Sequence, residues 1–170
     1  MVRHRVLVPA FVGSNPTPPT KPERNNMNKL IVLTTVEKER FLFNGNEPIL
    51  FLDDDIERIK IFKSHYPWCD VATTTEECIE KLKSSKYDFV FLDHDLDGKT
   101  YCNSDDTDTG AEVARWIVKN KPQIGNIIVH SYNNIGAEYM TQLLREHEYN
   151  SMKIPFFYLF NADIGDTNGC

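Results

Sequence analysis

Apolar residues occur along this chain in short runs, separated by longer segments in which apolar and polar positions alternate. Five runs are predicted to be strands, at residues 49–52, 70–73, 89–92, 127–129 and 154–160. Such short runs, rich in β-branched and aromatic side chains and bounded by turn residues, are typical of buried strands. In the segments between them, apolar residues recur every three or four positions, which predicts amphipathic helices.

Four helices are predicted in these intervening segments. Asp55 is placed to cap the first, whose apolar positions lie three residues apart. Thr74 and Glu77 have the spacing of a capping box and predict the start of the second. The third is predicted to begin at residues 108–110, and the fourth covers residues 135–148.

Strands that alternate with helices indicate the α/β class. We expect a three-layer sandwich, with an open five-stranded parallel sheet in the order 2-1-3-4-5 and helices on both faces. Residues 48–162 are predicted to form this domain. In sheets of this kind, ligands bind at the carboxyl ends of the strands, near the point where the strand order reverses.

Three further segments are predicted around the domain. Residues 1–27 are rich in proline and polar residues, a composition typical of a disordered arm. Residues 28–47 contain two β-prone runs, at 30–35 and 40–43, which predict a hairpin or an edge strand. Residues 163–170 are polar and are predicted to be a flexible tail.

The overall composition excludes several classes of protein. A net charge of -6 and a pI near 5.4 argue against generic duplex DNA binding. The four cysteines form no Cys-x-x-Cys pair, which argues against a zinc knuckle and favours reduced thiols. No apolar run reaches the ~20 residues of a membrane span. Because the apolar stretch near the start is short and interrupted by Pro9, we expect a cytoplasmic protein rather than an exported one.

Titratable side chains follow three of the predicted strands. The first strand is followed by Asp-Asp-Asp at 53–55, the third by Asp-His-Asp at 93–95, and the fourth by His-Ser at 130–131. The carboxyl ends of parallel strands meet at one edge of the sheet, so these groups are predicted to gather there. This edge is the candidate site.

The carboxylates at this edge predict a cation site. Asp55 is explained as the helix cap, which leaves Asp53, Asp54 and Asp93 as candidate ligands. Like charges this close require a cation or raised pKa values. Mg²⁺ or Mn²⁺ suits such a set, because these ions take carboxylate oxygens and keep positions for water or phosphate. The alternative is that these acids only cap helices and face solvent.

Two histidines predict acid–base chemistry at the same edge. His94 and His130 are candidates for a general acid and a general base. The alternatives are ligation of a transition metal together with Asp93 or Asp95, or ordinary hydrogen bonds. Ser131 is a candidate hydrogen-bond donor to a phosphoryl oxygen, or simply the start of a loop, and Thr109 lies at a helix N-terminus that favours an anion. The chain has no Gly-x-Ser-x-Gly elbow and no glycine-rich nucleotide loop.

Residues 49–160 resemble the receiver domain of response regulators, which has a flavodoxin-like strand order. The resemblance implies that Asp53 and Asp54 hold Mg²⁺ and that Asp93 is the phospho-acceptor. Two differences stand against ordinary phosphorelay. A receiver has Thr or Ser at the end of strand four, where this chain has His130, and Lys-Pro at the end of strand five, where this chain has Leu-Phe-Asn at 159–161.

The chain is more similar to a variant branch, the cyclic-phosphate processing receiver-like family of bacteria and phages. The resemblance rests on Leu-Asp-Asp at 52–54, Leu-Asp-His-Asp-Leu at 92–96 and His-Ser at 130–131. It implies a metal-assisted phosphoesterase that acts on cyclic phosphates, such as a small molecule or a 2′,3′-cyclic RNA end. The metal ligands would be Asp53, Asp54 and Asp93; the catalytic residues His94, His130 and Asp93; and the phosphate-binding or orienting residues Ser131, Asp95 and Thr109.

Three other functions are compatible with the sequence. One is a non-catalytic receiver-like module that binds a protein partner or a phosphorylated ligand, since a fold alone does not fix a function. Another is an aspartate phosphotransferase of the haloacid-dehalogenase type, suggested by Asp53-x-Asp55 but lacking the usual later motifs. The last is phospho-acceptor signalling through Asp93.

Overall fold

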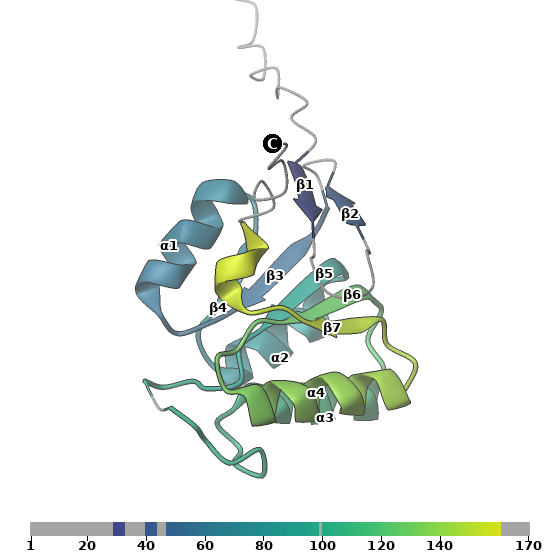
Figure 1. Ribbon diagram of the computed structural model, residues 1–170. Helices are drawn as coiled ribbons and strands as arrows, with labels where there is room; N and C mark the ends of the chain where they lie inside the picture. The colour runs from purple at the N-terminus through teal and green to yellow at the C-terminus, as the bar shows by residue number, and fades with distance from the viewer. Residues whose placement is uncertain (1–28, 33–39, 44–46, 99, 161–170) are drawn as a thin grey trace, which may run out of the picture.

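The main sheet has five parallel strands in the predicted order. The computed structural model describes residues 29–32, 40–43, 47–98 and 100–160. The strands are β3 (Ile49–Leu52), β4 (Asp70–Ala72), β5 (Tyr87–Leu92), β6 (Ile124–Val129) and β7 (Ser151–Lys153). Their order is β4-β3-β5-β6-β7, which confirms the order 2-1-3-4-5 and the receiver-like fold (Figure 1).

Helices cover both faces of this sheet. They are α1 (Ile56–His65), α2 (Thr75–Ser84), α3 (Gly110–Asn120), α4 (Asn134–Glu146) and the 3₁₀ helix η1 (Phe156–Leu159). Helices α1 and η1 lie on one face, and α2, α3 and α4 lie on the other (Figure 1). The predicted caps are present, since the Asp55 carboxylate accepts from two backbone N–H groups and Thr74 Oγ1 accepts from the N–H of Glu77. No helix among the described residues is both long and apolar enough to cross a membrane.

The central strands are apolar on both sides because both faces of the sheet are covered. In β3, Leu50 and Leu52 belong to the core beneath α2, α3 and α4, whereas Ile49 and Phe51 pack toward α1 and η1. All four are 0–1% exposed. This explains the continuous apolar run, which an antiparallel sheet with one solvated face would not require.

The fifth strand was predicted at the wrong residues. The prediction was 154–160, but β7 ends at Lys153 and residues 156–159 form η1. Pro155 has no N–H for the sheet ladder, so the strand ends before it and the chain turns back. Phe156 and Leu159 then cover the α1 face of the core. The sequence pattern did not separate this apolar turn from an apolar strand.

The β-prone runs before the domain form a separate pair of strands. β1 (Lys29–Val32) pairs antiparallel with β2 (Arg40–Phe43) in a two-stranded sheet of its own. This arrangement is a hairpin and not an edge strand of the main sheet. The predicted arm at 1–27 and the predicted tail at 163–170 lie outside the described residues.

Candidate functional site

The parallel register aligns the residues that follow β3, β5 and β6. The last residues of these strands are paired with one another, and Asp53, Asp93 and His130 come directly after them. The ladder continues by one step, because the N–H of Asp93 donates to the Leu52 carbonyl (3.1 Å) and the N–H of His130 to the Leu92 carbonyl (3.0 Å). The three residues therefore form one row across the edge of the sheet.

Arg58, in the first turns of α1, joins the two carboxylates of this row. Its Nε donates to Asp53 Oδ2 (2.7 Å), and its Nη2 donates to Asp53 Oδ1 (2.8 Å) and to Asp93 Oδ2 (2.6 Å). The side chains of Asp53 and Asp93 are 0% and 5% exposed, and that of Arg58 is 21% exposed. The three form a largely buried ion-pair network.

Sequence reasoning missed Arg58. The available signal was its position three residues after the helix cap Asp55, because side chains in helices lean toward the helix N-terminus. Here that direction leads back to the strand ends. Although burial opposes it, contact with Asp53 and Asp93 raises the pKa of Arg58, so the guanidinium stays charged.

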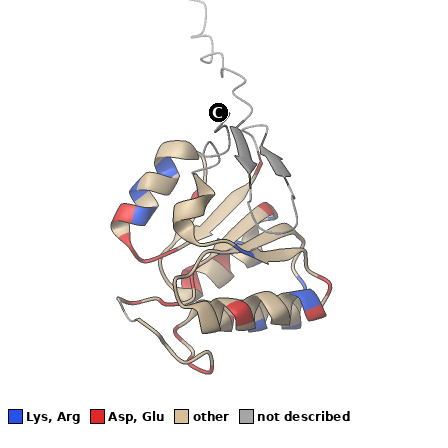
Figure 2. Ribbon diagram, viewed as in Figure 1, with Lys and Arg blue, Asp and Glu red and all other residues tan. Residues whose placement is uncertain are grey.

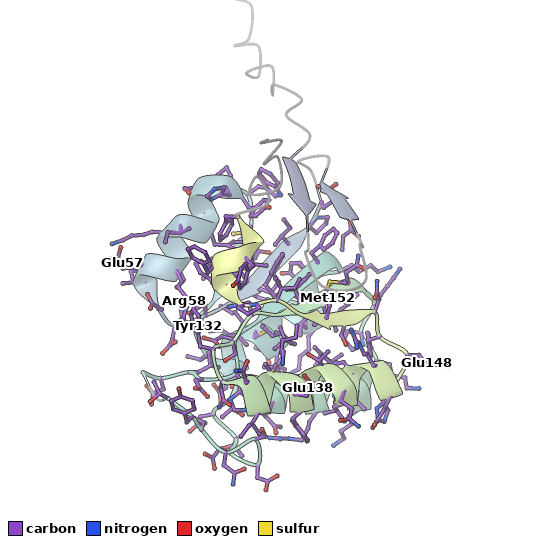
Figure 3. The ribbon with its side chains drawn as sticks, in the orientation of Figure 1. Glu57, Arg58, Tyr132, Glu138, Glu148 and Met152 are labelled. Carbon is purple, nitrogen blue, oxygen red and sulfur yellow. The ribbon has the colours of Figure 1, made fainter. Side chains whose placement is uncertain are left out.

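A cavity of about 480 Å³ opens at this edge of the sheet. Four of the residues predicted for the site line this cavity: Asp54, Asp93, Asp95 and Ser131. Arg58 and Tyr132 also line it, and Figure 3 shows these two side chains near each other beside the foot of α1. Four other candidates, Asp53, His94, His130 and Thr109, do not line it.

The carboxyl group of Asp93 is electrostatically unusual. Burial is the largest influence and raises its pKa, and the charge of Asp53 adds to the rise. His130, a hydrogen bond from Ser131 and the charge of Arg58 act in the opposite direction. The net result is a raised pKa at a carboxyl group that borders the cavity, a feature common at catalytic positions.

His130 lies beneath the carboxylates and not in the cavity. Its ring stacks on Phe51, with centroids 4.9 Å apart and planes at 12°. Its Nδ1 is 3.8 Å from Asp53 Oδ2, and among the described residues neither ring nitrogen has a hydrogen-bond partner. Burial lowers the pKa of His130, although the nearby charges of Asp93 and Asp53 oppose this effect. The predicted role of His130 as a general acid or base that faces the pocket does not agree with this buried position.

His94 lies on the other face of the sheet. Its Nδ1 is 2.7 Å from Asp95 Oδ1 and its Nε2 is 3.0 Å from Ser104 Oγ. The ring packs against α4 so closely that a Cβ added at Gly136 would lie 2.3 Å from His94 Cδ2. The prediction that two imidazoles face one pocket is therefore wrong. His94 follows Asp93 directly, and successive side chains of an extended chain point to opposite sides.

Replacing His130 by Phe is expected to raise the free energy of unfolding by about 1 kcal/mol, because it removes an unpaired buried polar group and keeps the stacking on Phe51. His94→Phe is the matched control. It should lower the free energy of unfolding by about 1–3 kcal/mol, because Asp95 and Ser104 would lose their hydrogen bonds to the two nitrogens of His94. Urea denaturation of the three proteins measures both changes. An equal loss of unfolding free energy in the two variants would contradict the view that the His94 ring has hydrogen-bond partners and the His130 ring has none in the described part of the chain.

Asp95 anchors the loop between β5 and α3. Its carboxylate accepts from the N–H of Tyr101 (2.6 Å), the N–H of Cys102 (3.2 Å) and Asn133 Nδ2 (3.0 Å). Burial acts to raise its pKa, but the hydrogen bonds from His94, from Asn133 and from this loop outweigh burial and lower it. Asp95 therefore lines the cavity with both oxygens already engaged, which suits orientation better than binding of an anionic phosphate.

Ser131 and Thr109 differ in position. Ser131 lines the cavity, where its hydroxyl donates a hydrogen bond to the Asp93 carboxylate and accepts one from the N–H of Asn133 (3.2 Å). Thr109 is buried at the start of α3, and its hydroxyl donates to the Asp106 carbonyl (3.0 Å). Ser131 is thus placed to meet a ligand, whereas Thr109 holds the loop that precedes α3.

The family model described as "Cyclic-phosphate processing Receiver domain" matches residues 48–146, more than half of the chain. The chain belongs to the cyclic-phosphate processing receiver family. The match includes all three strand ends that carried the resemblance and confirms it. It also includes α1, and with it Arg58.

Known structures similar to this chain include receiver domains and a complex that contains one. Response regulator TrrA from Thermotoga maritima, in complex with Mg²⁺-BeF, is 24% identical over 64% of this chain and 85% of that chain, with a TM-score of 0.48. The Francisella response regulator 1452 receiver domain is 17% identical over 64% and 84%, with a TM-score of 0.47. A complex of histidine kinase ThkA with TrrA matches at 24% over 65% and 87%, with a TM-score of 0.44. No curated protein sequence matches the chain.

The corrected end of strand five changes the comparison with ordinary receivers. Ile154 follows His130 in the row, because its N–H donates to the Val129 carbonyl (2.8 Å), and its side chain is buried. Lys153 directs its ammonium to Glu138 of α4 (2.9 Å) and does not line the cavity. Arg58 is therefore the one cationic side chain among the described residues that line the cavity.

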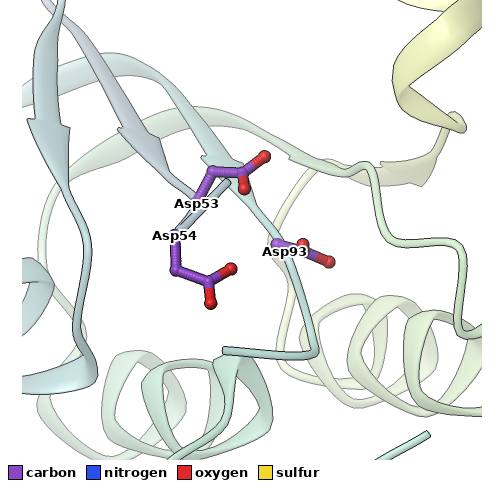
Figure 4. Close-up of side chains that lie close together, drawn as sticks. All are labelled: Asp53, Asp54 and Asp93. Atoms are coloured by element: carbon purple, nitrogen blue, oxygen red, sulfur yellow. The ribbon is translucent and has the colours of Figure 1, made fainter. Parts of the chain in front are cut away.

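Three carboxylates at the edge of the cavity fit a divalent cation. Asp53, Asp54 and Asp93 each offer an oxygen, and these oxygens lie within 4.8 Å of one another (Figure 4). Acidic residues also continue from the foot of α1 along the loop that leads to α3 (Figure 2). Three negative charges face one guanidinium, so the site keeps an excess of negative charge that Mg²⁺ or Mn²⁺ would neutralise. The donor set therefore fits the predicted metal.

Proposed function

We propose that the cavity at the strand ends binds a cyclic phosphate together with a divalent cation and opens the phosphate ring by hydrolysis. The observation that carries this proposal is the cluster of Asp53, Asp54 and Asp93 at the edge of a cavity of about 480 Å³. Membership of the family supports the substrate class. The ligand would be a 2′,3′-cyclic nucleotide, a related small molecule or an RNA end.

Each group at the cavity then has a defined task. Asp53, Asp54 and Asp93 would hold Mg²⁺ or Mn²⁺. The ion would supply positive charge to offset the negative charge that develops on the phosphate. Opening the ring would form a bond from a water oxygen to phosphorus and break one ester P–O bond, and the proton that the water gives up to Asp93 would pass to the departing ester oxygen, which leaves as a hydroxyl. Ser131, which lines the cavity, would turn its hydroxyl from Asp93 to a phosphate oxygen. Asp93 is the candidate proton acceptor, because it borders the cavity and burial raises its pKa.

The two histidines would act through the carboxylates in this scheme. His130 supports Asp53 from below, with Nδ1 3.8 Å from its carboxylate. His94 fixes Asp95 and, through it, the loop at the mouth of the cavity. Both would be positioning residues. Neither imidazole is placed to touch a ligand in the cavity.

Asp93→Asn is expected to lower turnover of a 2′,3′-cyclic nucleoside monophosphate by about 100-fold or more, because it removes both a metal ligand and the proposed proton acceptor. Release of the ring-opened phosphate, with Mg²⁺ or Mn²⁺ present, measures the rate. Asp88→Asn is the matched control, since Asp88 is exposed on the same strand and should leave turnover unchanged. The proposal fails if the natural sequence opens no cyclic phosphate with either metal.

A second candidate is a phospho-acceptor or ligand-binding module with a protein partner. The observation in its favour is that Asp93 borders the cavity next to Ser131 and Arg58, where an acyl phosphate would find a hydroxyl and a cation. Beryllofluoride binding at Asp93 without turnover of cyclic phosphates would favour this candidate. Turnover by the natural sequence and its loss in Asp93→Asn would favour the first.

A further inference from the structure

Arg58 occupies the space between the two carboxylates that the proposed metal needs. We propose that Arg58 is an internal counter-ion, which competes with the divalent cation for Asp53 and Asp93 and turns to the phosphate of the ligand when the cation binds. This inference rests on the proposed function and adds the residue that recognises the phosphate. It also predicts that cation and ligand bind cooperatively.

The oxygens of the carboxylate pair are already engaged. Both oxygens of Asp53 accept from Arg58, and Oδ1 accepts in addition from the N–H of Asp55 (2.9 Å). In Asp93, Oδ2 accepts from Arg58, and Oδ1 accepts from the N–H of His94 (2.7 Å). A cation that binds both residues would therefore have to share these oxygens with Arg58 or displace it.

Electrostatics makes the two cations alternatives to each other. Two carboxylates with 0% and 5% exposed side chains cannot both stay ionised without a nearby positive charge. Arg58 supplies that charge when no metal is bound. A divalent ion held by the same oxygens would lie within a few ångströms of the guanidinium, and their repulsion favours departure of Arg58.

The cavity offers the displaced guanidinium a place and a task. Arg58 already lines the cavity, and its Nη1, 3.7 Å from Asp55 Oδ2, makes the longest of its ion-pair contacts. Rotation of the side chain leaves the backbone of α1 in place. A planar guanidinium can bind a phosphate through two parallel hydrogen bonds, which an ammonium group cannot do. The lysine of strand five is unsuited to this task, because Lys153 faces α4.

Titration calorimetry with Mn²⁺ alone tests the competition. Arg58→Gln is expected to bind Mn²⁺ about tenfold more tightly than the natural sequence, because no internal cation has to leave first. Lys60→Gln is the matched control. Lys60 lies on the same helix, is exposed and pairs with Glu57, so the same change of charge there should leave Mn²⁺ affinity unchanged.

Ligand binding at saturating Mn²⁺ tests the second part. For both inorganic phosphate and 2′,3′-cyclic AMP, Arg58→Gln is expected to bind about tenfold or more weakly, because it lacks the charged fork. Arg58→Lys keeps the positive charge without the planar guanidinium. Its affinities for Mn²⁺ and for phosphate should both lie between those of the natural sequence and those of Arg58→Gln. Circular dichroism checks the fold, and Arg58→Lys serves for all readouts if Arg58→Gln does not fold.

Each outcome decides between the two proposals. Equal Mn²⁺ affinities in the natural sequence and in the Arg58 variants would overturn the competition. Equal phosphate affinities at saturating Mn²⁺ would overturn the role of Arg58 toward the ligand. Either result leaves the proposed hydrolysis standing if the natural sequence still opens cyclic phosphates. A natural sequence that binds neither Mn²⁺ nor 2′,3′-cyclic AMP would overturn both proposals together.

Discussion

Replacing Gly110 by Ala is expected to lower the free energy of unfolding by about 3 kcal/mol or to prevent folding, because the added methyl group has no space. A Cβ at this position would lie 1.8 Å from the carbonyl oxygen of Asp93 and 3.1 Å from Met140 Cε. The first contact is with backbone, which cannot rotate away. The N–H of Gly110 also donates to the His94 carbonyl (2.9 Å), so α3 begins directly against the residues of the site.

Urea denaturation measures this loss, and Gly98→Ala provides the control. A Cβ at Gly98 would meet no atom within 4 Å, but its φ of +65° is unfavourable for alanine. This control should therefore cost only about 1 kcal/mol, from backbone conformation alone. If Gly110→Ala folds, it should also bind Mn²⁺ less tightly, because the backbone of Asp93 must move. A loss no greater than that of Gly98→Ala would contradict the close contact between α3 and the site.

Asp53→Asn is expected to weaken Mn²⁺ binding by about 100-fold, because a neutral amide is a poorer ligand and also leaves Arg58 in contact with Asp93. Asp53 is the most enclosed of the three ligands, with a side chain that is 0% exposed. Another group from the protein therefore cannot easily replace it. Titration calorimetry or the electron paramagnetic resonance of free Mn²⁺ measures the affinity.

Asp55→Asn separates ligation from general charge in this experiment. Asp55 lies two residues further along and borders the same cavity, but it serves as the helix cap. Asparagine caps helices as well as aspartate does, so this variant removes the same charge without loss of the cap. It should keep Mn²⁺ affinity within about threefold of the natural value, since exposed charges contribute little. Equal weakening in both variants would mean that the cavity attracts cations only diffusely.

Most of the fold was predictable from the sequence because local patterns agreed with the final structure. Short apolar runs such as residues 49–52 required a sheet covered on both faces, and the helix caps at Asp55 and Thr74 were visible from residue type and spacing. Strand five could not be placed. Residues 154–160 are apolar because they cover a core, and Pro155 ended the ladder in the middle of the predicted strand.

The site was predictable in part. Three carboxylates at neighbouring strand ends had to gather, since parallel strands end at one edge. The directions of His94 and His130 depend on the register of β3, β5 and β6, which the sequence does not state. Arg58 comes from a helix, and its contact with Asp93, 35 residues away, depends on how α1 packs on the sheet. Residue types could therefore be predicted better than their orientations.

The most direct test of the account is a crystal structure of the protein soaked with Mn²⁺, with anomalous scattering used to locate the ion. We predict a single strong peak bound by oxygens of Asp53, Asp54 and Asp93, with the guanidinium of Arg58 turned from these carboxylates into the cavity. A peak elsewhere, or no peak and an Arg58 still bonded to Asp53 and Asp93 at saturating Mn²⁺, would contradict it.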